Sequence, residues 1–351
     1  MASLNQDLAL LLLDAKQWRR PRSLASLAKG KRTVSTLYWG LRHQQLGYLG
    51  ISRYLDVAQL DFRALQQRHL IAIENERYRL TQTGQAQQQQ LRSQLVIDWQ
   101  ARFQTVDLIR LKQRLLLLVQ VVSEFQHHQA HYFVVRTPLR EQQWVKSYFK
   151  QLRQSQRYQL VGSDLTVYLE TLPDQTAQVL GQELVGYQNN GLTRDQIAIS
   201  VQQNSLAVAF FELSALGKLV DWCQRHPHSV LAPLCQGLAR PLISKNALRT
   251  LNLYQATKSL EVVAHTQRIR QSTVQEHLLE TAIYLPMAQF PYVDFTSKDQ
   301  VKQLIAQWGP DVDTWQFQTR PDEHLTFLQF RLIQIWLTKE QQGESSDGEP
   351  N

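Results

Sequence analysis

The sequence contains few of the residues that mark several protein classes. It has 2 cysteines, 14 glycines and 11 prolines in 351 residues, which excludes a disulfide scaffold, a collagen-like chain and a low-complexity chain. Its apolar runs, such as Leu8–Leu13 and Leu115–Val119, are far shorter than the roughly 18 residues of a membrane span. The first run also lacks the basic region of a secretory signal. We therefore expect a soluble cytoplasmic protein, in the nucleoid if it binds DNA, with no membrane partner.

Acidic residues are scarce in the first half of the chain. Residues 1–160 hold 24 Lys and Arg against 10 Asp and Glu, whereas residues 161–351 hold 14 against 20. Within the basic half, residues 16–79 carry 13 cations and 4 acids. This asymmetry predicts a polyanion as partner at one end and a different partner at the other. A solvated basic face without any ligand is the alternative.

Helical periodicity dominates the N-terminal region and ends in two short alternating segments. Those segments, 71–73 and 78–80, flank Glu74-Asn75-Glu76 and predict a β-hairpin. Three helices followed by a hairpin form a winged-helix pattern. A helix over residues 4–18 precedes these three, which cover residues 22–29, 33–43 and 57–70.

The rest of the chain predicts a mainly α fold. The Gln-rich stretch 84–94 is either a linker or the start of a long helix that continues to Val122. A short strand is possible within residues 158–169, and residues 176–245 are typical of an all-helical region. We divide the chain into a winged-helix-like DNA-binding domain (1–84), a helical middle domain (85–243), a helix-turn-helix domain (244–340) and a disordered acidic tail (341–351).

The most specific local pattern lies in residues 259–283 and predicts a helix-turn-helix. Ala264 is small enough to let two helices cross closely, and Ile269, Val274 and Leu278 are spaced to fill the wedge between them. Ser272 is the expected N-cap of the second helix, with Gln275 completing a capping box. The side chains expected to face outward are Thr273, Gln275, Glu276 and His277, with Arg268 and Arg270 in the turn. The net charge of this region is nearly zero, so protein docking is the alternative to DNA contact.

The N-terminal winged helix has the stronger electrostatic signal for nucleic acid. Lysines and arginines that can position phosphates stand beside hydroxyl groups that can reach phosphates or base edges. Two helices, 33–43 and 57–70, are candidates to enter a groove, and the hairpin is a candidate wing. The candidate DNA-binding residues here are Lys29, Lys31, Arg32, Thr33, Ser35, Thr36, Arg42, Arg63, Arg68, Arg77 and Arg79. A winged helix that binds only protein is the alternative.

A second basic stretch interleaves cations with aromatic residues. Its cations include Lys146, Lys150, Arg153 and Arg157, and its aromatics are Trp144, Tyr148, Phe149 and Tyr158. Such a pattern is typical either of a single-strand-binding surface that stacks bases or of core aromatics at helical spacing.

Motifs for catalysis and metal binding are missing. Gly30-Lys31 would need glycine in place of Ala25 and a hydroxyl residue in place of Arg32 to form a phosphate loop. Cys223, His226, His228 and Cys235 match no common zinc spacing. We expect no enzymatic activity, catalytic residue, metal, cofactor or small-molecule substrate.

Several of these segments together resemble a known family. Val263-Ala264, Ile269 and residues 272–278 are similar to the helicase-associated helix-turn-helix domain of many RecQ-type helicases and of stand-alone YpbB-like proteins. Residues 292–295, 301–305 and 325–332 are similar to the aromatic-rich stretch that closes that domain. The segments 30–33, 78–84 and 190–198 resemble parts of the YpbB-like proteins.

The resemblance implies a non-enzymatic bacterial protein that works with a RecQ-like DNA helicase supplying the motor. Our hypothesis is an accessory factor in DNA repair or recombination whose partners are DNA and a RecQ-family helicase. The basic N-terminal part would hold duplex or forked DNA, and the acidic C-terminal part would dock the helicase or a second DNA segment. The alternative is a sequence-specific transcriptional regulator that uses both helix-turn-helix units.

Overall fold

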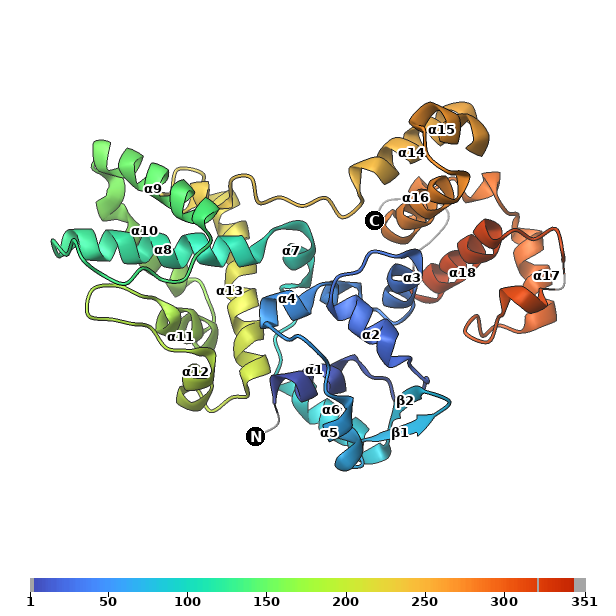
Figure 1. The fold of residues 1–351 in the computed structure, drawn as a ribbon, viewed down its shortest axis with the longest axis horizontal. Helices are drawn as coiled ribbons and strands as arrows, with labels where there is room; N and C mark the ends of the chain where they lie inside the picture. The colour runs from blue at the N-terminus through green and yellow to red at the C-terminus, as the bar shows by residue number, and fades with distance from the viewer. Residues whose placement is uncertain (1–2, 321, 344–351) are drawn as a thin grey trace. The chain divides into compact units, whose positions relative to one another are not determined.

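The computed structural model describes residues 3–320 and 322–343, which are mostly helical (Figure 1). The described part holds 18 α-helices, six short 3₁₀ helices and one two-stranded sheet. The predicted mainly α class is confirmed. Most of the predicted disordered tail lies outside the described residues, and the last helix ends at Gln341. The 3₁₀ helices are η1 (Leu46–Tyr48), η2 (Arg157–Gln159), η3 (Ala232–Cys235), η4 (Met287–Gln289), η5 (Tyr292–Asp294) and η6 (Phe317–Thr319).

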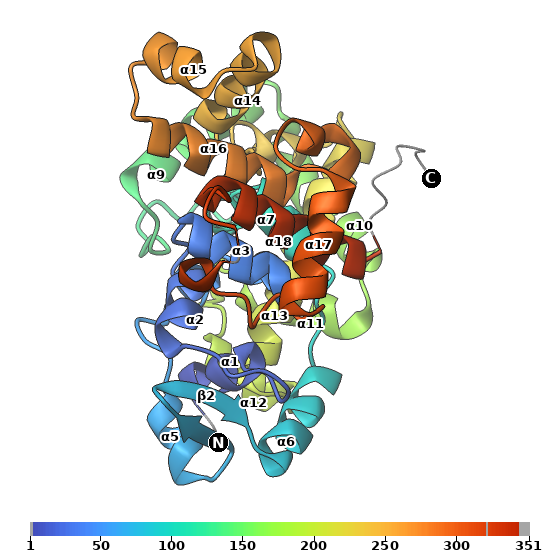
Figure 2. The ribbon, with the colours of Figure 1, turned by 90° about the vertical axis from the view of Figure 1, so that its right-hand side faces the viewer.

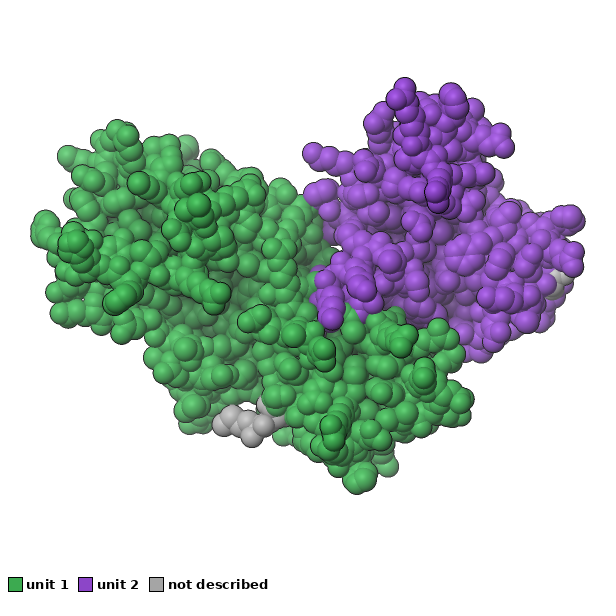
Figure 3. Space-filling model, viewed as in Figure 1, with its two compact units in different colours: residues 1–25, 50–240 green, residues 26–49, 241–351 purple. Residues whose placement is uncertain are grey.

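The chain forms two compact units that alternate along the sequence (Figure 3). The first unit contains residues 1–25 and 50–240, and the second contains residues 26–49 and 241–351. The boundary after residue 25 falls inside helix α2 (Pro21–Ala28). Residues 26–49, which the sequence placed in an N-terminal domain, therefore group with the C-terminal part of the chain.

A small module with a hairpin forms one end of the first unit. It combines α1 (Leu4–Leu12), α5 (Phe62–Gln67), β1 (Ile71–Glu74), β2 (Arg77–Leu80) and α6 (Gln82–Ser93), as Figure 2 shows. The antiparallel register pairs Ile71 with Leu80 and Glu74 with Arg77. Asn75 and Glu76 both have positive φ, 46° and 58°, the conformation of a type I′ two-residue turn. The predicted hairpin is confirmed.

Two of the predicted N-terminal helices have wrong boundaries, for local reasons. The first ends at Leu12, because the Asp14 carboxylate accepts hydrogen bonds from the backbone N–H groups of Lys16 and Gln17 and so holds a turn. Within the predicted helix 57–70 only α5 is helical, and a separate short helix, α4 (Ile51–Leu55), precedes it. Asp56, with φ 56°, ends α4, and Asp61 caps α5 by accepting from the Ala64 N–H at 3.1 Å.

Most of the remaining helices of the first unit pack around α13 (Ser205–Arg225). This helix is apolar on every side, and 16 of its 21 residues are buried, as expected of a helix at the centre of a bundle. The Gln-rich stretch belongs to α6, which ends before the later helices begin. Around α13 lie α7 (Gln100–Thr105), α8 (Leu108–Gln126), α10 (Leu160–Glu170), α11 (Asp174–Glu183) and α12 (Arg194–Ser200), and α9 (Leu139–Gln154) packs on α8.

The strand considered within residues 158–169 is wrong, because these residues form η2 and α10. Val161, Leu165 and Tyr168 are all buried. Their spacing of four and three residues places them on one face of a helix. The all-helical expectation for the region that follows is met by α11, α12 and α13.

A buried ionic cluster joins four helices of the first unit. Glu212 on α13 is fully buried and accepts hydrogen bonds from Tyr54 Oη, Lys112 Nζ and Arg194 Nη2, each at 3.0 Å. Burial raises its pKa, but Lys112 and Arg194 outweigh that effect and lower the pKa of Glu212 to about 2. The carboxylate is therefore ionised at neutral pH and links α4, α8, α12 and α13.

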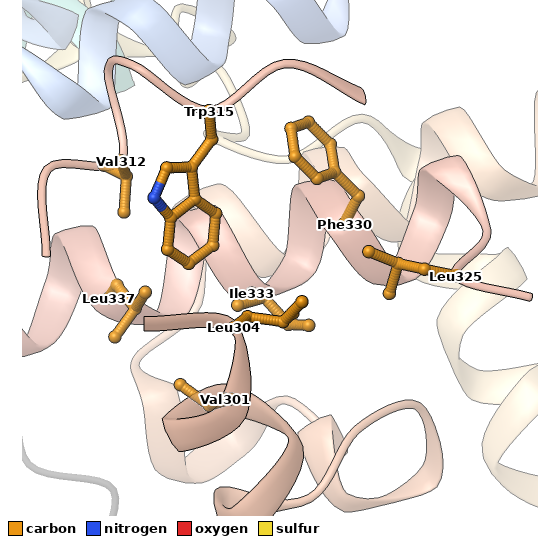
Figure 4. Packing of buried hydrophobic residues seen from close by; sticks show 8 residues of the cluster. All are labelled: Val301, Leu304, Val312, Trp315, Leu325, Phe330, Ile333 and Leu337. Atoms are coloured by element: carbon orange, nitrogen blue, oxygen red, sulfur yellow. The ribbon is translucent and has the colours of Figure 1, made fainter. Parts of the chain in front are cut away.

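The second unit is organised around α18 (Phe327–Gln341), ten of whose 15 residues are buried. Figure 4 shows Val301 and Leu304 of α17 (Lys298–Trp308), together with Val312 and Trp315, packed against Phe330, Ile333 and Leu337 of α18. Helix α3 (Val34–Arg42) packs on both α16 (Gln271–Tyr284) and α18. The other helices of this unit are α14 (Lys245–Thr257) and α15 (Leu260–Gln267).

Candidate nucleic-acid interface

Helices α15 and α16 form the predicted helix-turn-helix in the second unit. Val263, Val274 and Leu278 are completely buried between the helices, and the Ile269 N–H donates to the Ala264 carbonyl at 3.0 Å. Helix α14 packs against both helices and completes a three-helix group. Of the residues that the spacing placed in the wedge, Val274 and Leu278 are therefore core residues, whereas Ile269 is half-buried.

The turn between the two helices is built on an arginine in the left-handed conformation. Arg268 has φ 55° and ψ 44° and is the C-cap of α15, with its N–H donating to the His265 carbonyl at 3.2 Å. Glycine is the common residue in this conformation, because a side chain there is strained. The arginine side chain is exposed, so the position presents a cation instead of a bare backbone.

The predicted N-cap of α16 is wrong by two residues. Arg270 is the N-cap, with extended backbone (φ −70°, ψ 149°) and no side-chain cap, and the helix begins at Gln271. Ser272 therefore lies inside the first turn and makes no capping box with Gln275. The first backbone N–H groups of a helix have no partner within it and carry partial positive charge. Without a capping side chain, this end of α16 remains able to bind an anion.

The side chains around this open helix end divide into outward and inward groups. Arg268, Arg270, Ser272 and Glu276 are exposed, whereas Thr273 and Gln275 are half-buried. The expected outward position of His277 is wrong. Its Nδ1 lies 2.8 Å from Thr250 Oγ1 on α14, and this fully buried threonine also donates to Gln267. Helix α14 covers that side of α16, and the spacing within residues 259–283 contains no signal of this packing.

Of the cations expected in the turn before α3, Arg32 is already engaged. Lys29, Lys31 and Ser35 are exposed, but Arg32 Nη2 donates to Glu280 Oε1 at 2.7 Å. The same oxygen of Glu280 accepts from the Ser244 N–H at 2.8 Å. Arg32 thus links the α2–α3 turn to the beginning of α14 and to the buried half of α16.

Three other candidates in this segment have structural roles within the second unit. Thr33 is the N-cap of α3, and Thr36 is buried with its hydroxyl 2.8 Å from that of Thr33. Arg42, with its side chain only 14% exposed, donates from Nε and Nη2 to the two oxygens of Asp313 at 2.9 and 3.1 Å. A guanidinium held in this bidentate way is not available to a phosphate.

The remaining N-terminal candidates belong to the first unit. Arg63, Arg68 and Arg77 are exposed, and the Arg79 guanidinium lies 4.6 Å from the centre of the Trp18 ring. The candidates between Lys29 and Arg42 belong instead to the second unit. The basic segment 16–79 is therefore divided between two units, which the linear charge pattern did not predict.

The aromatics expected either to stack bases or to form core are half-buried and make contacts within the first unit. Trp144 lies under the Arg114 guanidinium at 4.0 Å. Phe149 and Tyr158 each lie 5.3 Å from the Phe125 ring centre. Tyr148 Oη donates to the Val230 carbonyl at 2.7 Å. The rings of these four residues are engaged within the first unit.

The cysteines and a histidine of residues 223–235 make contacts within the first unit. Cys223 is buried with its side chain hydrogen-bonded to that of Cys235, and the His226 ring stacks on Trp222 at 4.3 Å. Over residues 3–320 and 322–343 the structure has no group of three or more His, Cys, Asp or Glu side chains that could hold a metal ion. No helix in that same part of the chain is sufficiently long and apolar to traverse a bilayer.

Fold and sequence together define a protein with a C-terminal helix-turn-helix domain. A family model described as a helix-turn-helix domain matches residues 246–334, which include α15, the turn and α16. The chain is similar to Protein YpbB of Bacillus subtilis (strain 168), with 25% identity over 343 residues, 90% of this chain and 91% of the relative. The resemblance to YpbB-like proteins is thus confirmed along most of the chain. No solved structure matches it.

Proposed function

We propose that this chain is an accessory DNA-binding protein that works with a RecQ-family helicase in DNA repair or recombination. A helix-turn-helix domain suggests DNA binding. The observation that carries the proposal is the uncapped N-terminus of α16 beside the exposed Arg268 and Arg270. The other half of α16, residues 278–283, is buried in the second unit, so that unit holds the open end of the helix in place.

In the proposed complex, the first turns of α16 enter the major groove of duplex DNA. Arg268 and Arg270 would contact phosphates beside the groove. The backbone N–H groups at the start of α16 would add to the attraction for phosphate. Ser272 and Gln275 are the side chains of suitable type to reach base edges. The exposed Glu276 would accept from a cytosine amino group and disfavour other bases.

The helicase part of the proposal rests on the resemblance of Val263-Ala264, Ile269 and residues 272–278 to the helicase-associated domain. A protein without an ATPase motif needs a motor supplied by another chain in order to act on a fork. An accessory protein that contacts both DNA and helicase would raise the effective concentration of one at the other. No catalytic role for this chain is needed in that scheme.

Charge reversal at the turn tests the DNA-binding part. Arg268→Glu/Arg270→Glu is titrated with a labelled duplex by fluorescence polarisation at several salt concentrations between about 50 and 200 mM, the range over which phosphate contacts dominate. Loss of two phosphate contacts should lower the slope of log affinity against log salt by about 2.

The matched control is Lys245→Glu/Lys302→Glu, two exposed cations of the same unit. Lys245 follows Ser244, which is bonded to the buried half of α16, and so stands away from its open end. The control should keep the wild-type slope. Equal losses in both variants, or none in either, would contradict the assignment of the turn.

A pull-down of the tagged chain with and without nuclease tests the partner. Recovery of the helicase after nuclease treatment is the expected result, because it requires direct contact. Recovery only while DNA is intact would contradict direct contact. A dimer that selects one palindromic sequence would instead favour the transcriptional regulator.

A further inference from the structure

The first unit contains a long segment whose exposed charges are all positive. Between Glu124 and Asp164 the chain has six lysines and arginines and a single acid, Glu141. Glu141 is 1% exposed, and its two oxygens accept from Arg110 Nε and Arg114 Nε, each at 2.6 Å. Its charge is therefore neutralised inside the unit. All six cations of the segment are exposed: Arg136, Arg140, Lys146, Lys150, Arg153 and Arg157.

Helix α9 arranges three of these cations along a hollow in the surface. The hollow has a volume of about 800 Å³ and is lined by Lys146, Lys150 and Arg153, with Phe149 at its apolar part. The remaining lining residues are Gln143, Ser147 and Gln154. Lysines four residues apart on a helix share a face. The hollow thus offers a row of cations and neutral hydrogen-bonding groups, and none of its lining residues is acidic.

The loop that leads into α9 presents one aromatic ring directly to solvent. Phe133 is 99% exposed, which is unusual for a residue that normally contributes most when buried. Its backbone is nevertheless held in place by the buried Gln120 of α8. The Gln120 amide donates to the Phe133 carbonyl at 2.8 Å and accepts from the Val135 N–H at 2.9 Å. The loop therefore holds its backbone fixed while its aromatic side chain has no packing partner.

We propose that this segment binds single-stranded nucleic acid. The cations of α9 would follow the phosphate backbone, and Phe133 would stack on an unpaired base, with Arg136 of the same loop and Arg140 at the start of α9 following it in the sequence. An exposed ring beside cations is the arrangement by which proteins bind single strands without sequence preference. In a duplex the faces of the bases are already stacked, so the ring would have nothing to contact there.

The charge pattern decides against an apolar protein partner. Interfaces between proteins are depleted of lysine, whereas Lys146 and Lys150 both line the hollow. The proposal concerns the first unit only. It does not require the helix-turn-helix to bind DNA, and its failure would leave the function proposed for the second unit untouched.

The test uses the full chain and a labelled oligothymidylate of about 30 nucleotides, long enough to span several sites of the usual size of about 4–16 nucleotides. Phe133→Ala should weaken binding by about 5- to 150-fold, the range expected for loss of one stacked base. Phe133→Trp should restore it. Because the wild-type side chain is fully exposed, neither change is expected to disturb folding.

The triple variant Lys146→Glu/Lys150→Glu/Arg153→Glu tests the cations. Its log affinity for the oligonucleotide should depend on log salt with a slope smaller by about 2, since each lost phosphate contact contributes about 0.7 for single strands. The charge-matched control is Lys16→Glu/Arg53→Glu/Arg225→Glu, three exposed cations elsewhere in the same unit. It should keep most of the wild-type slope.

Titrations with a duplex of equal length distinguish the outcomes. The proposal is supported if Phe133→Ala and the triple variant of α9 each lose more affinity for the single strand than for the duplex. Unchanged single-strand binding in Phe133→Ala would overturn it. So would equal losses for both forms of DNA, or capture of an acidic protein that the same variants release while oligothymidylate is ignored.

Discussion

At the scale of single residues, Arg268 combines two properties that substitution can separate. Its backbone occupies the left-handed region, and its side chain is exposed at the turn of the helix-turn-helix. The first property costs stability, and the second places a cation beside the open end of α16. A glycine would adopt this backbone conformation without strain but would provide no charge.

Arg268→Gly and Arg268→Ala are therefore expected to differ in stability but not in binding. Glycine relieves the strain and should stabilise the second unit by about 0.5–1 kcal/mol relative to alanine. Both variants lose the same charge, so duplex affinity should fall equally. Urea denaturation and polarisation measurements on the same preparations check this. A stability difference of zero would show that Arg268 is unstrained.

Asp7 is a second residue whose burial has a measurable consequence. It lies on α1 and is 7% exposed, and burial raises its pKa to about 6, although Arg68 acts in the opposite direction. The folded chain therefore holds this proton more tightly than the unfolded chain does. Its contribution to stability is complete below about pH 4 and is lost as pH rises to about 6, by roughly 3 kcal/mol.

Asp7→Asn removes this dependence, because the amide has the same shape and no charge to desolvate. The variant should be more stable than the wild type at pH 8 by about 2–3 kcal/mol and nearly equal to it at pH 4. Chemical denaturation at the two pH values measures the difference. Glu74→Gln on the exposed hairpin is the control, for which we expect no such change. An equal effect of Asp7→Asn at both pH values would exclude titration of Asp7 as the cause.

At the scale of elements, the predictions that succeeded depend on residues close together in the sequence. The hairpin was predictable because its alternation and its turn span ten residues, and the helix-turn-helix because its wedge residues repeat at fixed spacing. The ends of helices were less predictable. Asp14 and Asp61 select turns and caps that compete with helix continuation, and several polar residues near each boundary have equal ability to do so.

Contacts between residues far apart in the sequence made the candidate site harder to predict than the helix ends. Arg32 and Glu280 are 248 residues apart, and Arg42 and Asp313 are 271 apart. No local pattern distinguishes a cation that meets such a partner from one that stays in solvent. The exposed Arg268 and Arg270 were predicted correctly because the motif itself defines its outer side, whereas the direction of His277 depends on α14. Phe133 was missed because an isolated aromatic in a loop has no periodic signal.

Gly84 provides an element-scale prediction at the start of α6. A Cβ at this position would lie 1.9 Å from the Leu70 carbonyl oxygen, so α6 sits against the strand end only because the side chain is absent. Gly84→Ala should therefore destabilise the first unit by about 2–4 kcal/mol, as forced overpacking does. Denaturation midpoints measured by circular dichroism provide the test.

Gly162 on α10 is the matched control in the same unit. A Cβ there would meet nothing within 4 Å, so Gly162→Ala should stabilise by about 0.5–1 kcal/mol through helix propensity alone. Stability changes of similar size and the same sign in both variants would show that the close approach of Gly84 to Leu70 does not determine the stability of the first unit.

At the scale of the whole molecule, the chain contributes to the second unit twice. Residues 26–49 belong to it together with residues 241–351, and Leu37 and Tyr38 of α3 are completely buried. The Arg331 guanidinium lies 4.2 Å from the centre of the Tyr38 ring. A fragment that begins near residue 241 would expose the surfaces of α16 and α18 that α3 covers. Each large apolar side chain left without a partner costs about 2 kcal/mol.

We therefore expect fragment 241–351 to be much less stable than the same fragment carrying residues 26–49 on a flexible linker. Binding of a hydrophobic dye and thermal unfolding of the two fragments measure the difference. A fragment 241–351 that unfolds at the same temperature with and without the added segment would contradict the observed division of the chain.

The central claim is that the helix-turn-helix of the second unit meets duplex DNA at the open end of α16. Photochemical cross-linking of the full chain to a forked DNA, followed by mass spectrometry of the cross-linked peptides, tests it most directly. The account predicts that cross-links from the duplex arm map to residues 265–276. Cross-links from that arm found only outside the helix-turn-helix would contradict it.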